Sequence, residues 1–577
     1  MNYSAPQLEV TAPTEEQMEP KVEQTDDELL ALANQWMKES GEFHDSLKKI
    51  QDKNEKYYLG DQTDRDQIPS HKCNAVSNRI FMGVETIVPV MTSNTAQFVV
   101  NPAQETEPSQ QMADSLQEVL KGQYDARKVK KVLEQAARHM IIYRFGVIKA
   151  FWDEYIDDWN LKAVRPQRIW IPKYGATEDE VPFIIEKIDM TVSEIGEYFG
   201  DKMKDEVKNQ MTKTEDGGYE AAVTVWEIWT NDFVFWKYGS LILKKQKNPY
   251  FDWTGRKKGE TDEMGNAVVE DVYYNHFRRP RKPYIFLSPF RLGKSIVGET
   301  SLIEQAVSLQ DVVNTLMRQI VNNAKKMGNG AWFVDAGVME EEKAKNAITN
   351  KEGIIIYGTG AANPNLLRRE QAAPLPNYIA NAQLSAEMAF DNIFGTHSTT
   401  RGERGNPETL GGRIMLKQGD VSRIDLLVRE IDRAVAEMGN WATQLMKLYY
   451  VSQKTVKIYG QNGLKFITFS RDNIEDGIEI AVKEGSTLQV DEVSRRNEAL
   501  QLFQIGALDP ITLYERLKFP NPQEAAEKLW RWQTGQLLPA QQAQTQQMNK
   551  PGSQQTIQSP TNEIQQGRQN IQGGGGI

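Results

Sequence analysis

The strongest constraint on the fold of this chain is a helical apolar period that runs from Gly298 to Met327. Apolar residues recur there at steps of three and four: Leu302, Ala306, Leu309, Val313, Leu316, Ile320 and Ala324. The positions between them form an equally regular polar face: Ser308, Asp311, Thr315, Arg318, Asn322 and Lys325. This spacing predicts one amphipathic helix, roughly 40 Å long if unbroken.

Two further helices follow the first. A shorter one is expected from about Pro376 to Phe394, with one apolar face: Ile379, Ala386, Phe390 and Ile393. A very long one is expected over 408–450, again with steps of three and four: Ile424, Leu427, Ile431, Val435, Met438, Trp441, Leu445 and Leu448. Between the first two helices, the strand-like "AWFVDAG" and "GIIIYG" flank a charged helix, "MEEEKAKNAI". This pattern predicts a small α/β insertion.

The polar stretch "THSTTRGERGNP" separates the second and third helices and cannot build a core of its own. His397 and Ser398 suggest a base beside a nucleophile, but sequence neighbours rarely face each other and no third member is evident. The glycines indicate a loop that can move. Pro407 suits the first turn of the long helix.

The first half of the chain mixes both kinds of secondary structure. Helices are expected at 29–59, 74–93 and 110–143, the last as a pair. After Gly146 the chain is rich in β-branched and aromatic residues bounded by Gly, Pro and Asn, which predicts strands as far as 287. A short helix, "TVSEIGEYFG", interrupts them. The fold class is therefore α+β.

Composition bounds the class of protein. The chain has 577 residues, of which 39% are hydrophobic and 25% charged, as in soluble globular proteins. No apolar run approaches the roughly 20 residues needed to span a bilayer, and the start resembles no signal peptide. A single cysteine, Cys73, excludes an intrachain disulfide and a cysteine-based zinc site, and we expect a reducing compartment. Residues 1–28 and 536–577 have the composition of disordered segments.

The formal net charge of −11 argues against tight, sequence-independent nucleic-acid binding. The net charge does not exclude a protein that encloses DNA without binding it tightly.

Several motifs suggest chemistry, and each has a simpler explanation. Gly293-Lys294-Ser295 lies between a strand and a helix, but position 288 is Ser and not the Gly of a phosphate-binding P-loop, so we favour a polar turn. "GTGAAN" lacks the third Gly of a dinucleotide loop. The acids of "WDEYIDDW" could hold Mg²⁺, although an acidic hairpin tip is commoner. The five histidines show no metal-ligand spacing, and we expect no cofactor, metal or catalytic residue.

An aromatic run could stack bases or sugars, but strand cores use the same residues, and we favour packing. Its members are Trp226, Trp229, Phe233, Phe235, Trp236, Tyr238, Tyr250, Phe251 and Trp253.

The order of elements and several stretches resemble the portal (head–tail connector) proteins of tailed bacteriophages. The resemblance covers roughly residues 30–535. It rests on "YYLGDQ", "NRIFMGVETIVPV", "YRFGVIKAFWDEY", "PYIFLSPFRLGKSIVGETSLIEQAVSLQDVVNTLMRQ" with Gln310 and Asn314, "NPETLGGRIMLKQGDVSRIDLLVREIDRAV" and "GALDPITLYERLKFPNPQEAAEKL".

The resemblance implies a portal-type fold with named parts. A wing would comprise 29–298 and 408–485, the latter with a long helix and strands. Stem helices would occupy 299–327 and 376–394, joined by a clip at 330–375. A tunnel loop would span 395–407 and a helical crown 486–535.

The resemblance also implies a function. The chain would form a ring, usually of twelve subunits, at one capsid vertex of the virion, after assembly in the host cytoplasm. Double-stranded DNA would pass through it during packaging and ejection. Its partners would be other copies of the chain, the large terminase at the clip, head–tail adaptor or tail proteins, and capsid and scaffolding proteins, with no membrane.

Basic rings in an otherwise acidic channel would give the DNA transient contacts. We expect Arg318 and Lys325 on the stem, and Arg401 and Arg404 beside Thr399 in the tunnel loop, to line the channel. The simpler reading of these basic residues is surface or intersubunit salt bridges. Two rival functions are a non-viral ring-forming scaffold protein and a nucleic-acid-processing enzyme.

Overall fold

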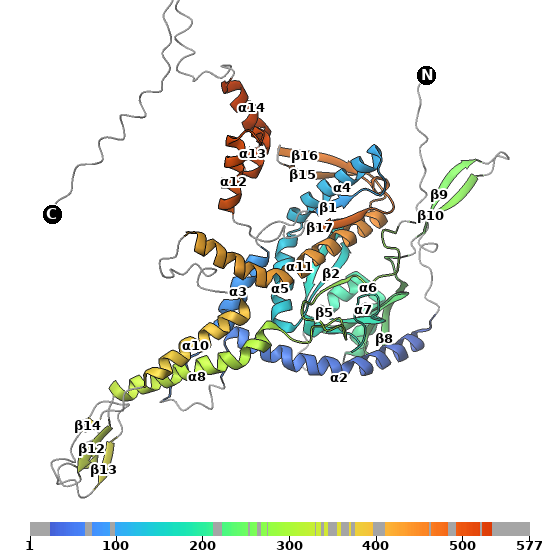
Figure 1. The fold of residues 1–577 in the computed structure, drawn as a ribbon. Helices are drawn as coiled ribbons and strands as arrows, with labels where there is room; N and C mark the ends of the chain where they lie inside the picture. Colours follow the sequence, from blue (N-terminus) through green and yellow to red (C-terminus); the bar gives the residue numbers. More distant parts are fainter. Residues whose placement is uncertain are drawn as a thin grey trace, which may run out of the picture. The chain divides into compact units, whose positions relative to one another are not determined.

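The fold is given by a computed structural model of the whole chain, drawn in Figure 1. The structure describes residues 24–63, 72–92, 98–211, 222–251, 254–261, 267–273, 275–328, 331–335, 340–343, 355–358, 369–370, 376–395, 410–460, 463–482, 492–517, 519 and 522–533. The predicted disordered ends therefore lie almost wholly outside the described residues, as does most of the charged helix expected in the insertion.

The chain divides into two compact units. The first comprises Met1–Gly460 and Leu464–Val490, and the second comprises Gln461–Gly463 and Asp491–Ile577. The helices of the first unit are α2 (Asp26–Leu59), α3 (Arg79–Met91), α4 (Glu107–Ala126), α5 (Val129–Tyr143), α6 (Val192–Phe199), α7 (Asp201–Gln210), α8 (Leu302–Gly328), α10 (Asn377–Phe394) and α11 (Leu410–Tyr449). The helices of the second unit are α12 (Glu492–Gln504), α13 (Pro510–Arg516) and α14 (Pro522–Gln533).

The strands build several small sheets. The strands before α8 are β1 (Phe98–Asn101), β2 (Gly146–Asp153), β3 (Asp158–Val164), β4 (Ile169–Trp170), β5 (Phe183–Thr191), β6 (Ala222–Thr230), β7 (Phe233–Tyr238), β8 (Leu241–Lys247), β9 (Thr254–Thr261), β10 (Ala267–Tyr273) and β11 (Tyr284–Leu287). The remaining strands are β12 (Ala331–Asp335), β13 (Ile355–Gly358), β14 (Arg369–Glu370), β15 (Lys454–Gly460), β16 (Gly463–Phe469) and β17 (Glu479–Val482). Together with the helices they confirm a mixed α/β chain.

The sheets are antiparallel with one exception. The largest has the order β4-β5-β6-β7-β8, and a second has the order β11-β2-β3. In the insertion, β12 pairs with β13 in parallel and with β14 in antiparallel fashion. Ribbons of two strands are formed by β1 with β17, β9 with β10, and β15 with β16.

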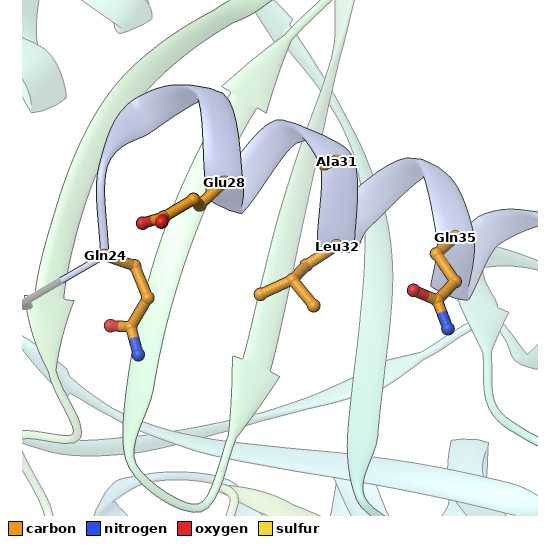
Figure 2. A pocket seen from close by; sticks show the side chains of 5 residues that line it. All are labelled: Gln24, Glu28, Ala31, Leu32 and Gln35. Atoms are coloured by element: carbon orange, nitrogen blue, oxygen red, sulfur yellow. The ribbon is translucent and has the colours of Figure 1, made fainter.

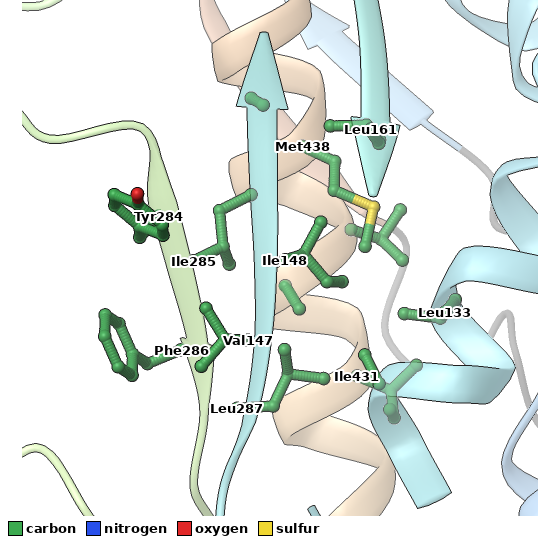
Figure 3. Packing of buried hydrophobic residues seen from close by; sticks show 14 of the residues in the cluster. Leu133, Val147, Ile148, Leu161, Tyr284, Ile285, Phe286, Leu287, Ile431 and Met438 are labelled. Carbon is green, nitrogen blue, oxygen red and sulfur yellow. The ribbon is translucent and has the colours of Figure 1, made fainter. Parts of the chain in front are cut away.

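The main core lies where α5 and α11 pack on the β11-β2-β3 sheet. Figure 3 shows Ile148 and Val147 of β2 among side chains from α5, α11 and β11, with Leu133 and Ile431 on the flanking helices. Every apolar position predicted for the long helix from Ile424 to Leu448 is buried. The period of three and four therefore identified the buried face of α11 correctly.

The long first helix is fixed at both ends by local chemistry. Thr25 caps α2 by accepting a hydrogen bond from the Glu28 N–H, and the Glu28 side chain returns to the Thr25 N–H. Gly60, with φ of 83°, ends the helix in the left-handed conformation that glycine adopts without strain. This capping box starts the helix at Asp26, three residues before the predicted position 29.

The aromatic run packs into the cores. Trp229 stacks on Tyr250 with ring centroids 5.4 Å apart, and Trp441 of α11 meets Tyr250 edge-on at 5.4 Å. Phe233 and Phe235 are buried against α2. Three more members of the run pack against core clusters as well: Trp226, Trp236 and Tyr238. The packing interpretation is confirmed for these seven members of the run, the structure does not test it for Phe251, and Trp253 lies outside the described residues.

Candidate functional site

The predicted stem helices α8 and α10 lie side by side, with β12 following the end of α8 (Figure 1). Arg79, the first residue of α3, ties the pair to the rest of the unit. Its guanidinium is ion-paired with Glu387 of α10 and, at 3.3 Å, with Asp391 one turn further on. Because all three side chains are largely buried, this pairing is weakly screened by water. The candidate site is built around this junction.

Four polar residues of α8 recur every four positions and face one segment of the chain. We call Gln310, Asn314, Arg318 and Asn322 the polar ladder, and residues 72–78 the strap. The strap runs as irregular chain into the start of α3 and has no helix or sheet of its own to satisfy its backbone. The ladder supplies those partners, because side chains four apart lie on one face of a helix.

Gln310 caps α3 from another element. Its Oε1 accepts hydrogen bonds from the N–H groups of Arg79, at 3.1 Å, and Ile80, at 3.3 Å. These are the first two residues of α3, whose N–H groups have no partner within the helix. The side chain of Asn78 accepts a hydrogen bond from the N–H of Phe81, the third residue of α3, at 3.1 Å. Gln310 also donates to the Ser77 carbonyl at 2.6 Å.

The other ladder residues hold the strap further along. Asn314 accepts from the Ser77 N–H at 3.0 Å and donates to Gln62 at 2.7 Å. Asn322 accepts from the Cys73 N–H at 2.7 Å. Arg318 donates from Nε to the Ala75 carbonyl at 3.2 Å and from NH2 to the hydroxyl of Thr63.

This arrangement differs from the predicted faces of α8. Ser308, Asp311 and Thr315 are exposed as expected, but Arg318 is half-buried against the strap. Gln310 and Asn314, outside the predicted polar face, are buried. The sequence marked both amides as carriers of the resemblance, but it did not predict their burial or their role, because their partners lie more than 230 positions earlier in the chain. The sequence offered one signal for a buried polar contact: the amides of Gln310 and Asn314 are four residues apart and lie beside the apolar face of the helix.

The remaining predicted channel residues are placed only in part. Lys325 of α8 is half-buried and has an interaction partner. Thr399, Arg401 and Arg404 lie outside the described residues, as do His397 and Ser398. The structure thus places Arg318 and Lys325 on one helix, α8. It does not test whether the predicted tunnel loop lines a channel.

A close approach joins α3 to the end of α10. The position of a Cβ on Gly83 lies 2.6 Å from Cδ1 of Phe394. Real Cβ contacts are never so short, so the aromatic ring requires a glycine here. Phe394 also stacks on Phe390 at 4.8 Å, and both rings are buried. This contact and the Arg79 ion pairs fix α10 against α3.

The most deeply buried charges lie outside this junction. Lys149 of β2 contacts Glu186 of β5 at 2.8 Å and Glu227 of β6 at 2.5 Å. Burial alone would lower the pKa of Lys149, but attraction to the two carboxylates outweighs it and raises the pKa. Burial opposes the charged form of Glu186 as well, yet Lys149 and Lys162 hold its pKa low. Each group is closely paired within the core, so the cluster joins the sheet of β2 to the sheet of β5 and β6.

The acidic hairpin tip is structural. Asp158 is paired with Arg127 and accepts a hydrogen bond from the Tyr450 hydroxyl at 2.7 Å. Asp157 pairs with Lys454 at 2.6 Å. The hairpin formed by β2 and β3 confirms the simpler explanation of these acids. Among the described residues no group of His, Cys, Asp and Glu side chains could hold a metal ion.

The suspected phosphate loop does not have the geometry of one. Gly293, Lys294 and Ser295 lie in irregular chain between β11 and α8, and the helix begins only at Leu302. A P-loop opens directly into its helix, whose N–H groups face the phosphates. The polar-turn interpretation therefore holds.

A surface hollow of about 570 Å³ lies at the start of α2. Figure 2 shows that its lining comes from a single stretch: Gln24, Glu28, Ala31, Leu32 and Gln35. Binding pockets enclose their ligand with several elements. One helix face with exposed amides does not do so. In the part of the chain that the structure describes, no helix has the length and hydropathy needed to cross a bilayer.

Comparison with known proteins gives one broad match. The model of the phage P22-like portal protein family matches residues 34–574. None of the curated proteins compared matches the chain. Among solved structures, a chain in "Neck of empty GTA particle computed with C6 symmetry" is 13% identical, and the match covers 76% of this chain and 89% of that one. Its TM-score of 0.35 is too low to argue for a shared arrangement.

Proposed function

The chain belongs to the phage P22-like portal protein family, and from this premise we propose that it forms a ring at the unique capsid vertex. The ring has twelve copies and is the channel through which double-stranded DNA enters and leaves the capsid. It docks the large terminase during packaging and the head–tail adaptor or tail proteins afterwards. The observation that supports this most is the match over nearly the whole chain, since the family is one of structural proteins and not of enzymes.

The parts of the chain take the following roles. Residues 29–298 and 408–485 form the wing. Helices 299–327 and 376–394 form the stem around the channel, and 330–375 form the clip, which meets the terminase and later the adaptor. Residues 395–407 form the tunnel loop, and 486–535 form the crown. The order of elements along the chain supports this division: α8, the β12–β14 insertion, α10 and then α11.

The charge of the chain suits a channel that must let DNA slide. A predominantly basic lining would hold the duplex by releasing its counterions. A chain with a net charge of −11 instead offers a repelling wall with isolated basic positions. Arg401 and Arg404 in the tunnel loop, beside Thr399, together with Arg318 and Lys325 on α8, supply those positions.

The ring is tested by imaging the purified full-length chain in negative stain. We expect rings with a central hole wide enough for a DNA duplex. A chain that stays monomeric at every concentration would contradict the proposal. Particle mass by native mass spectrometry gives the copy number independently of the images.

The role of the tunnel loop is tested in assembled particles that carry Arg401→Ala/Arg404→Ala. We expect the particles to form but to package or retain less full-length DNA than wild type. Arg429→Ala is a matched control, because Arg429 is exposed on α11 and paired with Asp425 on the same helix at 2.9 Å. If the double variant packages and retains DNA as wild type does, the loop arginines have no part in DNA handling.

A further inference from the structure

The five-stranded sheet of the first unit has an edge that a further strand could join. β8 pairs with β7 on one side and, among the strands that the structure describes, has no neighbour on the other. Both faces of the sheet are already covered. Leu29 of α2 packs with Phe235 on one face, and Ile195 of α6 packs with Leu243 on the other. A partner of this sheet would therefore have to bind along the outer edge of β8.

The alternation of hydrogen bonds shows which backbone groups of β8 face outward. Just beyond the strand pair, the N–H of Asn248 donates to the carbonyl of Asp232 at 2.8 Å. In an antiparallel ladder, hydrogen-bonded pairs and non-hydrogen-bonded pairs alternate. Lys245 lies opposite Phe235, three positions further along the ladder. This pair is therefore of the non-hydrogen-bonded kind, and the N–H and C=O of Lys245 point away from β7.

The outer edge of β8 is positively charged. The strand has the sequence "LILKKQK", with three lysines and no acidic residue. The side chain of Lys244 is exposed to solvent. Lysines on an edge strand discourage pairing with neutral or basic strands. An acidic strand meets no such repulsion, so the charge of the edge selects an acidic partner.

The chain itself supplies an acidic segment beside this edge. Nζ of Lys245 donates to the carbonyl of Gln24 at 3.0 Å and pairs with Asp26 at 2.7 Å, so the start of α2 lies beside β8 (Figure 1). Residues 1–23, which we call the N-terminal arm, precede this point and contain five acidic residues and one lysine. Because the arm is attached at the edge, its local concentration there is high.

One stretch of the N-terminal arm has the pattern of a strand. In "QLEVTA", residues 7–12, Leu8 and Val10 alternate with polar residues, and a proline stands on each side of the stretch. The chain from Ala12 to Gln24 can span up to about 40 Å. β8 has 7 residues and is therefore about 23 Å long. The stretch can thus reach every position along the edge.

We propose that residues 7–12 of the N-terminal arm pair with the outer edge of β8, as a sixth strand in the sheet of the same chain. The stretch has too few apolar residues to fold alone. It becomes ordered through backbone hydrogen bonds to the edge and through attraction between its glutamate and the lysines of β8. The pairing takes place within one chain and is independent of the proposed ring, so either can fail without the other.

The pairing is tested by hydrogen–deuterium exchange of the full-length chain as a dilute monomer, resolved to single amides. The test variant is Val10→Pro/Thr11→Pro, which removes two successive N–H groups without changing the charge. Successive N–H groups of a strand point to opposite sides, so one of the two must face β8. We expect the amide of Lys245 to exchange roughly tenfold faster in this variant than in wild type. The matched control, Gln17→Pro/Met18→Pro, lies outside the strand-like stretch and should leave that rate unchanged.

Three outcomes of this experiment would overturn the proposal. The first is an equal exchange rate of the Lys245 amide in wild type and in Val10→Pro/Thr11→Pro, whether that amide is protected in both or in neither. The second is an equal effect of the control pair, because residues 7–12 would then not be the strand. The third is protection in rings but not in monomers, which would assign the edge to the arm of another copy.

The choice of an acidic partner is tested separately by reversing a charge on the edge. Lys244→Glu should speed the exchange of the amides of residues 8–12 several-fold, because the edge then repels the arm. Lys173→Glu is the control, since Lys173 is exposed in the loop after β4 and undergoes the same change of charge. Unchanged exchange of residues 8–12 in Lys244→Glu would contradict the charge complementarity on which the choice of the arm rests.

Discussion

Gln310 of α8 accepts a hydrogen bond from the backbone N–H of Arg79, the first residue of α3, at 3.1 Å. A helix start is thereby capped by a side chain from a second helix. The Arg79 side chain in turn is ion-paired with α10. One residue thus links α3 to both proposed stem helices, through its backbone to α8 and through its guanidinium to α10.

The first prediction concerns this cap. Gln310→Ala removes the acceptor for two N–H groups and the donor to the Ser77 carbonyl. The Arg79 N–H keeps a second acceptor, the Ser77 carbonyl at 2.9 Å, so the Ile80 N–H is the donor that loses its partner. A buried donor left without a partner costs about 1–3 kcal/mol, and we expect the free energy of unfolding to fall by about that amount, measured by urea denaturation of the dilute chain. Gln319→Ala, exposed on the same helix, should change it by less than about 0.5 kcal/mol. Equal effects of the two variants would contradict the cap.

The second prediction concerns the contact between α3 and α10. In most helices Gly→Ala stabilises by about 0.5–1 kcal/mol. At Gly83 the added methyl group would overlap the ring of Phe394. We therefore expect Gly83→Ala to destabilise the chain by about 1–3 kcal/mol in thermal or urea unfolding.

A matched control exists in α2. Gly41 has open space where its Cβ would stand, so Gly41→Ala should show the ordinary stabilisation. Combining Gly83→Ala with Phe394→Leu should recover part of the loss, because the smaller side chain makes room. A stabilising Gly83→Ala would show that α10 does not approach α3 in this way.

The third prediction concerns pH. Burial, and next the positive charge of Arg165, lower the pKa of His139 to about 4 from an ordinary value near 6.5. Between these two values the unfolded chain binds a proton that the folded chain does not. Stability is therefore complete above about pH 6.5 and falls as pH falls toward 4, by on the order of 3 kcal/mol from this residue.

His139→Gln removes this titration. We expect the unfolding free energy of the variant to decline less than that of wild type between pH 7 and 4.5, when both are measured by urea denaturation. Burial also lowers the pKa of His276, so a residual decline remains in the variant. Parallel pH profiles for the two proteins would show that His139 does not titrate abnormally.

The sequence predicted those elements whose signals are local. The apolar steps of α11 located its buried face, and the strand-like run after Gly146 located β2. The capping of α3 was not predictable, because Gln310 acts on residues far away in the sequence. The helical period of α8 also predicted that Leu316 would lie on the buried face. In the structure the amides of Gln310 and Asn314 are buried, whereas Leu316 is only half-buried. For the loop residues Thr399, Arg401 and Arg404, composition and resemblance remain the basis of the prediction.

The fourth prediction concerns the buried charge cluster. Lys149→Met leaves Glu186 and Glu227 close together in the core without their shared cation. Removing one partner of a buried ion pair costs about 3–5 kcal/mol. We expect a loss of that size in urea unfolding, and a partial recovery when Glu186→Gln and Glu227→Gln are added. Lys162→Met removes the more exposed partner of Glu186 and should cost at most about 1 kcal/mol. If Lys149→Met were as mild as Lys162→Met, the buried pairing would not exist.

The last prediction separates two roles of Arg318. Its guanidinium donates to the Ala75 carbonyl and to Thr63, so it holds the strap within one chain. A role in contacting DNA would depend mainly on its positive charge. Lysine keeps the charge but lacks the planar fork that makes two directed hydrogen bonds.

We expect Arg318→Lys and Arg318→Ala to lower the unfolding free energy by similar amounts, about 1–3 kcal/mol. Particles that carry Arg318→Lys should nevertheless package more DNA than those with Arg318→Ala if the charge also acts in the channel. Lys325→Ala is the companion measurement, at the second basic position of α8. If Arg318→Lys and Arg318→Ala reduce packaging equally, the effect of Arg318 on DNA follows from the strap alone, and the basic ring on the stem loses this member.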